Sequence, residues 1–288
     1  GSSGAGGDYE IERSLRFNDA DSPELSRTPG SAGNRRTYTI SVWIKIFQKA
    51  SGHTYRAIIG AGGGSTRDRL QIFNDNKLVF NLNDSTDAYL RTTRVLRDPA
   101  AWYHIVVGVD TTQGTASNRI KLYVNGVQET SFTNSSYPTQ NYDCRLNNNI
   151  ETFIGQSSSD NLYFNGYMAE FHFIDGTQLD PSSFGETHED TAAWVPKKYA
   201  GSYGSQGWYL NFSDNSDVTA TTLGKDSSGN GNNWTPANLS VSSDFSTNDS
   251  FVDTPTANYA TLNPLQGRGT DSGESGTLPT FTQGNLYV

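Results

Sequence analysis

Acidic and amide side chains that could bind a metal ion lie close together at two points of the sequence. Asp84 and Asp87 are separated by a Ser-Thr pair, and Asp226 lies four residues before Asn230. Calcium takes six to eight oxygen ligands, which carboxylates, amides and backbone carbonyls on loops supply. Asx turns use the same residue types without a metal, so both interpretations stay open. The sequence requires no cofactor, and calcium is the one that these four residues could hold.

Aromatic residues in predicted loops could bind a sugar. A sugar-binding surface combines an exposed aromatic ring with nearby amide groups. The loop aromatics that could serve are Tyr137, Tyr142, Tyr163 and Trp194. Ordinary packing of the loops explains each of them equally well. These four residues are the candidate ligand-binding set.

Groups for covalent or acid–base catalysis do not cluster in the sequence. The four histidines, His53, His104, His172 and His188, are too dispersed to suggest a metal triad or a nucleophile–base pair. The single cysteine, Cys144, excludes an internal disulfide and a multi-cysteine metal site. We expect it to be a buried, unreactive thiol. The sequence therefore predicts no catalytic residue.

The charge balance and apolar pattern limit the partners. The chain has 288 residues, with 21 Lys and Arg against 30 Asp and Glu, and a net charge of −9. Its basic residues are scattered, whereas non-specific nucleic-acid binding needs a basic footprint. No segment approaches the roughly 20 consecutive apolar residues of a membrane-spanning helix. We therefore expect neither nucleic-acid binding nor membrane insertion.

The elements that must position any site are predicted to be strands. Residues 38–47 alternate strictly over ten positions, which is typical of a β-strand. Residues 102–109 alternate too, but both sets are largely apolar, as in a strand packed on both sides. Asn125-Gly126 tolerates the positive φ angles of a type I′ turn and places Val124 opposite Val127.

Further strands follow in the second half of the chain. Residues 165–175 alternate, with one predicted face formed by Tyr167, Ala169, Phe171 and Phe173 and the other by Met168, Glu170, His172 and Ile174. Residues 208–212 and a weaker segment, 234–241, supply two more strands, too few for an independent domain. No helical period persists for 12 residues. Short strands joined by polar turns indicate an all-β, two-sheet antiparallel sandwich.

The composition divides the chain into three parts. Residues 1–8 resemble a flexible linker or tag, residues 9–243 form the sandwich, and residues 244–288 form an extended tail. The tail is polar and interrupted by Pro and Gly, so it cannot bury a core of its own. We expect a neighbouring subunit or a further domain to order it. Its apolar residues would then be exposed in the monomer: Phe251, Tyr259, Leu262 and Phe281.

The order of the strand motifs resembles a known family. The motifs are Tyr38-Thr-Ile-Ser-Val-Trp-Ile-Lys45, Trp102-Tyr-His104, Ile120-Lys-Leu-Tyr-Val-Asn-Gly126, Phe153-Ile-Gly155 and Phe164-Asn-Gly-Tyr-Met-Ala-Glu-Phe-His-Phe-Ile174. Over residues 14–180 they resemble laminin-G-like domains of the concanavalin-A-like lectin/glucanase superfamily. The resemblance implies a two-sheet jelly roll that binds glycans or proteins, with calcium sometimes at the rim. Catalytic members carry a Glu-x-Asp-x-x-Glu run, which this chain lacks, so we expect it not to be an enzyme.

A second resemblance concerns the segments after the main strands. Residues 175–185, 194–199 and 226–234 are similar to a type found in structural proteins of marine bacteriophages. There the segment like 208–234 opens the domain, whereas here it follows the rest, which implies a circular permutation. The expected function is a non-catalytic binding module on the virion, a fibre or surface-decoration protein that recognises host cell-surface glycans. It would contact neighbouring virion subunits and form a homo-oligomer. The alternatives are a purely structural assembly protein and, third, a glycan-active enzyme.

Overall fold

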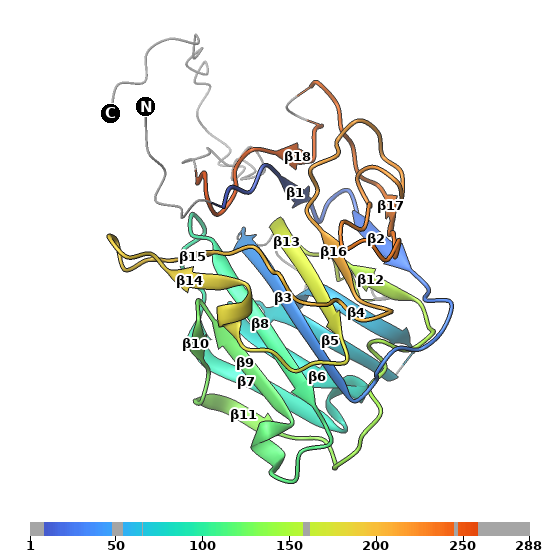
Figure 1. Ribbon diagram of the computed structural model, residues 1–288, viewed down its shortest axis with the longest axis vertical. Coiled ribbons are helices and arrows are strands. Elements are labelled where there is room, and N and C mark those ends of the chain that lie inside the picture. The colour runs from blue at the N-terminus through green and yellow to red at the C-terminus, as the bar shows by residue number, and fades with distance from the viewer. Residues whose placement is uncertain (1–8, 48–53, 65, 158–161, 245–246, 259–288) are drawn as a thin grey trace, which may run out of the picture.

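The chain folds into a sandwich of two antiparallel sheets, as predicted. The computed structural model describes residues 9–47, 54–64, 66–157, 162–244 and 247–258. Over these residues two eight-stranded sheets pack face to face, with β3, β8 and β13 in front of β4, β5 and β6 in Figure 1. The same described residues contain no helix long and apolar enough to cross a membrane.

The first sheet, called sheet A, is centred on β3, which pairs with β8 on one side and β13 on the other. Its strands are β10 (Val127–Gln128), β9 (Ile120–Val124), β8 (Tyr103–Asp110), β3 (Thr37–Ile46), β13 (Gly166–Asp175), β1 (Ser14–Phe17) and β18 (Ser250–Phe251), with β16 (Trp208–Leu210) also paired to β13.

The second sheet, called sheet B, begins at β11 and ends at β17. Its strands in spatial order are β11 (Phe132–Ser136), β7 (Ala88–Val95), β6 (Lys77–Leu82), β5 (Thr66–Phe73), β4 (Tyr55–Gly63), β12 (Thr152–Ile154), β2 (Glu24–Arg27) and β17 (Thr235–Ala237). A separate hairpin joins β14 (Gly185–Thr187) to β15 (Trp194–Pro196), and single 3-10 turns form η1 (Asn83–Ser85), η2 (Ala116–Asn118) and η3 (Pro181–Ser183).

The main core lies between the two sheets and is almost entirely apolar. Val107 and Phe171 are fully buried there, and the Phe171 ring lies 5.1 Å from the Trp208 ring. Cys144 is also buried in this core, as expected, and burial raises the pKa of its thiol. The outer face of sheet A carries a second set of buried side chains, among them Trp43. Sheet A is therefore covered on both faces.

A β-bulge in β13 corrects the predicted alternation of residues 165–175. Ala169 pairs with Trp43 and His172 with Ser41, so two residues of β13 stand opposite one of β3. The extra residue is Glu170, whose φ is 50°. Met168 consequently joins Phe171 and Phe173 in the main core, while Tyr167 and Ala169 face outward. The prediction that Tyr167 and Ala169 share a face with Phe171 was wrong, because a bulge shifts the face of every residue before it.

The predicted hairpin turn at Asn125-Gly126 is confirmed. The two residues have φ angles of 49° and 78°, and Val127 pairs with Val124. Glycine is required here for a second reason. A Cβ at Gly126 would lie 2.6 Å from the Trp194 ring, so only glycine leaves room for that indole.

The segment after residue 207 completes both sheets. β16 pairs with β13 and β17 pairs with β2, so the predicted pairing of residues 208–240 with the main sandwich is confirmed.

The described part of the predicted tail also packs on the sandwich, because β18 pairs with β1. Phe251 is only 6% exposed and its ring lies 5.4 Å from that of Tyr167, so the expectation that it is exposed was wrong. Buried ion pairs on either side of β18 hold this segment in place: Asp249 with Arg16 and Asp253 with Lys45. Tyr259, Leu262 and Phe281 lie outside the described residues, as do residues 1–8.

Candidate functional site

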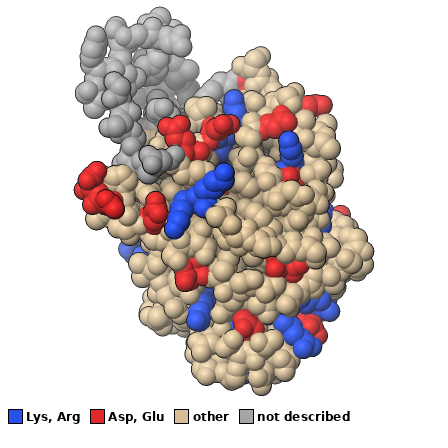
Figure 2. Space-filling view, viewed as in Figure 1, with Lys and Arg blue, Asp and Glu red and all other residues tan. Residues whose placement is uncertain are grey.

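The outer face of sheet A is covered by the chain that follows β13. This segment, residues 176–207 with the β14–β15 hairpin, crosses in front of β3 and β8 in Figure 1. Phe184 of this segment forms a small buried cluster with Val106, Tyr123 and Ile174 of sheet A. Figure 2 shows this side of the molecule, where acidic and basic side chains are scattered rather than gathered into one patch. We call residues 176–207 the roof.

One buried pair under the roof resembles a nucleophile and its base. Ser41 Oγ lies 2.8 Å from His104 Nε2. Trp194 Nε1, however, donates to His104 Nδ1 at 3.0 Å, so Nδ1 carries the lone pair and Nε2 carries the proton. Burial, and then the nearby His172, lower the pKa of His104 to about 3. His104 therefore donates to Ser41 and cannot take its proton, which makes the pair a structural one.

Glu170 occupies a second buried polar cluster under the roof. Its two carboxylate oxygens accept hydrogen bonds from Tyr9 at 2.7 Å and Tyr209 at 2.6 Å. His172 lies 3.5 Å from the same carboxylate, and its other ring nitrogen meets Tyr203 at 2.9 Å. Burial and the Glu170 charge raise the pKa of both Tyr9 and Tyr209. All these groups bond to one another, so they hold the roof and the N-terminal segment in place.

The outer face of sheet B carries an open hollow instead. The hollow has a volume of about 680 Å³ and lies over β2, β12 and β4. It is lined by Glu24, Gly62, Gly63, Arg145, Ile150, Glu151, Phe153 and Gln156. Its size falls within the range of small-molecule sites, about 300–1,000 Å³, and its polar groups converge on an apolar floor. We call it the sheet B hollow.

The strand pairing places the floor of this hollow. Phe153 pairs with Ser26 of β2 and Gly60 of β4, while the next residue, Ile154, faces the main core. Because successive strand residues point to opposite faces, the Phe153 ring lies on the outer face, where the residue is 9% exposed. Gly62 has a φ of 98°, and a Cβ there would clash with the backbone carbonyl of Thr66 and lie 3.1 Å from Arg145 Cδ. Glycine therefore allows the close approach of β4 to β5 beside Arg145.

A buried aspartate positions the loop that carries Arg145. Asp68 is fully buried and accepts hydrogen bonds from the backbone N–H groups of Asn83 at 3.0 Å, Arg145 at 2.5 Å and Leu146 at 3.2 Å. Burial raises the pKa of Asp68 to about 6, and the three N–H donors oppose that rise. Asp68 thus ties β5 to one wall of the hollow.

The polar rim of the hollow can both donate and accept hydrogen bonds. Gln156 Nε2 donates to Glu24, and burial together with the neighbouring Glu151 raises the pKa of Glu24. Glu151 is exposed and available to a ligand. An aromatic face attracts the weakly positive C–H groups of a sugar ring, and carboxylate, amide and guanidinium groups bond its hydroxyls.

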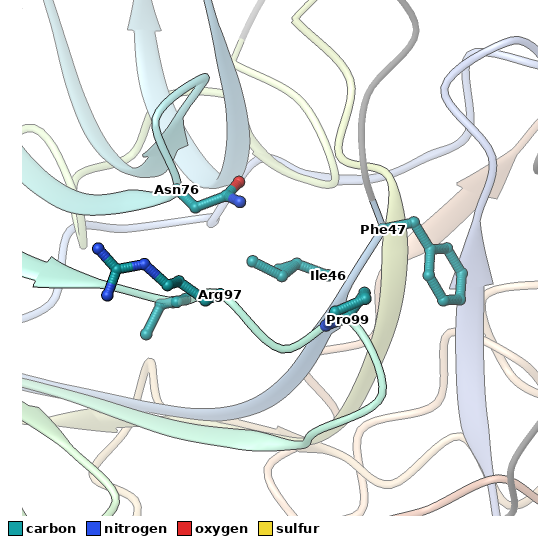
Figure 3. A pocket seen from close by; sticks show the side chains of 6 residues that line it. Ile46, Phe47, Asn76, Arg97 and Pro99 are labelled. Atoms are coloured by element: carbon teal, nitrogen blue, oxygen red, sulfur yellow. The ribbon is translucent and has the colours of Figure 1, made fainter.

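A second, smaller hollow lies at one end of the sandwich. Figure 3 shows Asn76, Arg97, Ile46 and Pro99 around it, with the Phe47 ring turned away. Its volume is about 100 Å³. That is room for roughly three water molecules at about 30 Å³ each, and too little for a sugar ring. The sheet B hollow is the better candidate.

The aromatic residues that the sequence singled out do not gather in one place. Trp194 lies in β15 rather than in a loop and packs on His104 at 6.1 Å. Tyr142 donates to Asp87 at 2.9 Å, and Tyr137 is partly buried against the main core. Tyr163 is half-buried. None of these four lines the sheet B hollow.

The predicted calcium ligands lie in separate loops and already have protein partners. Asp84 pairs with Arg67 at 3.2 Å and Arg69 at 2.5 Å. Asp87 accepts a hydrogen bond from Tyr142. Asp226 accepts from the backbone N–H groups of Tyr209, Ser228 and Asn232. Asn230 Nδ2 donates to the carbonyls of Gly204 and Gly207. Among the described residues, no three His, Cys, Asp or Glu side chains are grouped to hold a metal. Calcium binding at these positions stays a prediction.

The residues that line the hollow were not singled out in the sequence. Glu24 and Arg145 come from segments about 120 residues apart and meet only through the pairing of β2, β12 and β4. Phe153 belonged to a predicted strand, but three residues are too few to show which face it takes. In the sequence, the glycines that follow residue 60 indicated that another segment could approach the backbone closely at this point.

Comparison with known proteins gives the family and distant structural neighbours. A laminin G family model, described as "Concanavalin A-like lectin/glucanases superfamily", matches residues 20–181. No curated protein sequence matches the chain.

Solved structures that are similar include a heptameric SAP-like pentraxin from Limulus polyphemus, with 15% identity, a TM-score of 0.44, and 59% of this chain and 79% of that chain covered. Domains LG4-5 of the mouse laminin α1 chain share 13% identity with a TM-score of 0.41, covering 66% and 48%. Domain 4 of a GH43 arabinanase from Geobacillus stearothermophilus, in complex with arabinotriose, shares 20% identity with a TM-score of 0.36, covering 52% and 65%.

The chain thus spans about four fifths of the pentraxin but less than half of the laminin segment. The family model covers more than half of the chain, and the strands that it matches form the two-sheet sandwich described above. The chain therefore belongs to the laminin G-like family of the concanavalin A-like lectin/glucanase superfamily.

Proposed function

We propose that the chain is a non-catalytic glycan-binding module whose ligand occupies the sheet B hollow. The observation that carries this proposal is the combination of an outward Phe153 ring with Glu24, Arg145, Glu151 and Gln156 around one opening of about 680 Å³. The exposed part of Phe153, 9% of the residue, contacts the sugar ring while the sugar hydroxyls bond the rim. Two carboxylates face one guanidinium, so the hollow disfavours acidic sugars and selects neutral ones.

The module binds rather than cleaves. Hydrolysis of a glycosidic bond needs one carboxyl group to protonate the leaving oxygen and a second to act as nucleophile or base. Of the two carboxylates here, Glu24 is bonded to Gln156. Incubation with the bound polysaccharide tests this part, and release of reducing sugar would overturn it.

The proposed setting is the surface of a bacteriophage particle. It rests on the resemblance of residues 175–185, 194–199 and 226–234 to structural proteins of marine bacteriophages. On a particle, many copies displayed together would turn weak binding per copy into useful avidity for cell-surface glycans. Cryo-electron microscopy of the intact assembly would test this placement.

A glycan array probed with the full chain tests binding. We expect neutral oligosaccharides to bind, and Arg145→Gln and Glu151→Gln each to weaken that binding at least about tenfold, since hydrogen bonds to charged groups contribute about 1.5–3 kcal/mol. The matched controls are Glu186→Gln and Lys197→Gln, an exposed pair 3.8 Å apart on the roof. Equal losses in both sets, or no binding by any glycan, would overturn the proposal.

A further inference from the structure

A lysine, an aspartate and an asparagine meet beside β18. Lys45 Nζ lies 2.7 Å from Asp253 Oδ2, and the two side chains are only 3% and 2% exposed. The same Nζ lies 3.0 Å from Asn258 Oδ1. A C=O bond is about 1.2 Å long, so the Asn258 Cγ atom is at most roughly 4.2 Å from Nζ. An amine, an amide carbon and a carboxylate thus lie within reach of one another.

The surroundings of this triad are apolar and hold its members in place. Trp102 Nε1 donates to the other Asp253 oxygen at 3.1 Å. Ile11, Phe47, Trp102, Tyr167 and Phe251 belong to the buried cluster on this face of sheet A. Asn258 Nδ2 donates to the carbonyl of Ala100 at 3.2 Å, which fixes the amide plane, and the residue itself is exposed. Nucleophile and proton carrier are therefore buried, while the leaving nitrogen lies near solvent.

We propose that Lys45 and Asn258 form an intramolecular isopeptide bond, with Asp253 as the catalytic proton carrier. The ion pair first passes a proton from the Lys45 ammonium to the Asp253 carboxylate, whose Oδ2 lies 2.7 Å from Nζ. The neutral Nζ then attacks Cγ of Asn258, and the carbonyl electron pair moves onto Oδ1.

The tetrahedral intermediate next loses ammonia. The Asp253 carboxylic acid gives its proton to Nδ2 and takes one from Nζ. The carbonyl then re-forms as the Cγ–Nδ2 bond breaks, and the released ammonia takes the proton that Asp253 received from Nζ. In total, one ammonium group and one amide become one secondary amide and one ammonium ion, and Asp253 ends as the carboxylate it was at the start. No oxidant or co-reactant is needed, and two reacting groups held in one oriented site react much faster than the same groups free in solution.

The bond would tie β3 to the end of the described chain. With a single cysteine, the chain has no internal disulfide to do so. The link from Lys45 to Asn258 crosses the outer face of sheet A next to β18, so it locks the segment 247–258 over β1 and Trp102.

Intact-mass spectrometry of the folded full chain tests this inference. We expect a mass lower than that of the sequence by one ammonia, and a proteolytic peptide in which the segments around Lys45 and Asn258 are joined. A mass equal to that of the sequence would overturn the proposal. So would loss of water with a peptide joined at Asp253, because the acceptor would then be the carboxyl group.

Variants separate the bond from other losses of ammonia. Lys45→Arg keeps the positive charge but cannot form the link, and loss of ammonia persisting in it would indicate cyclisation of the asparagine alone and overturn the proposal. Asn258→Ala changes an exposed side chain, and we expect it to fold, to keep the full sequence mass and to unfold at a lower temperature. Asp253→Asn should keep both reacting groups and yield no joined peptide, so a joined peptide in this variant would contradict the role of Asp253.

Discussion

The two outer faces of this sandwich are built by the same alternation of strand residues, yet one is covered and the other is open. On sheet A the roof and the segment 247–258 bury Lys45, Arg16 and Glu170, and each charge has a partner within the protein. On sheet B the charged groups of Arg145 and Glu151 line an open hollow. The difference shows that polar residues on a sheet face have a structural role where chain covers them and become available to a ligand where it does not.

The largest expected effect concerns the covered face at low pH. His104 has a pKa of about 3 in the folded protein, against an ordinary value near 6.5. Below pH 6.5 the His104 side chain binds a proton in the unfolded chain, whereas in the folded chain it stays neutral until the pH nears 3. The free energy of unfolding should therefore fall by up to about 5 kcal/mol as the pH drops from 6.5 to 3. Denaturant unfolding should show that His104→Gln loses less stability than the wild type as the pH falls from 6.5 to 3. An equal loss in both proteins would contradict a buried neutral histidine.

Breaking an ion pair should cost more stability where the pair is buried beside the segment 247–258 than where it is exposed on the roof. Asp249→Ala leaves the buried Arg16 guanidinium without its carboxylate, 3.0 Å away in the native protein, and we expect a loss of about 3–5 kcal/mol. Glu186→Ala breaks an exposed pair of the roof and should cost less than about 1 kcal/mol. Chemical denaturation of both variants makes the comparison. Similar losses would mean that the segment 247–258 does not cover the face in solution.

Asp68, beside the sheet B hollow, should make the free energy of unfolding depend on pH in the direction opposite to that of His104. The Asp68 pKa of about 6 lies above its ordinary value of 3.8, so the folded state binds the extra proton. The resulting stabilisation is complete below about pH 4 and is lost as the pH rises through 6, by about 3 kcal/mol. Asp68→Asn should remove this fall. If the difference in free energy of unfolding between the wild type and Asp68→Asn stays constant between pH 4 and 7, Asp68 ionises normally and the prediction is wrong.

The fold was predictable where periodicity was strong, and parts of it were not. Residues 38–47 gave a clear period-2 signal because β3 has an apolar inner face along its whole length. β2 was missed in a turn-rich segment because it is short and only Leu25 is fully buried. The bulge at Glu170 could not be read either, since one extra residue leaves the strand's composition unchanged.

The candidate site was less predictable than the fold, for a physical reason. Trp194, one of the aromatics expected to bind a ligand, stands in a segment that the sequence marks as a loop but that packs as part of the roof over sheet A. Phe153 and Arg145 acquire their roles only from the order of the strands in sheet B, which joins segments far apart in the sequence. Composition and spacing carry no information on that order.

The most direct test of the account is the hydrogen-exchange footprint of a bound glycan on the full chain. The strongest ligand from the array is added at saturation, and amide protection is compared with that of the free protein. We predict new protection in β2, β12, the end of β4 and residues 145–151, with no change in residues 176–207. Protection confined to the roof, or spread over both faces, would contradict the claim that the open face of sheet B is the binding surface.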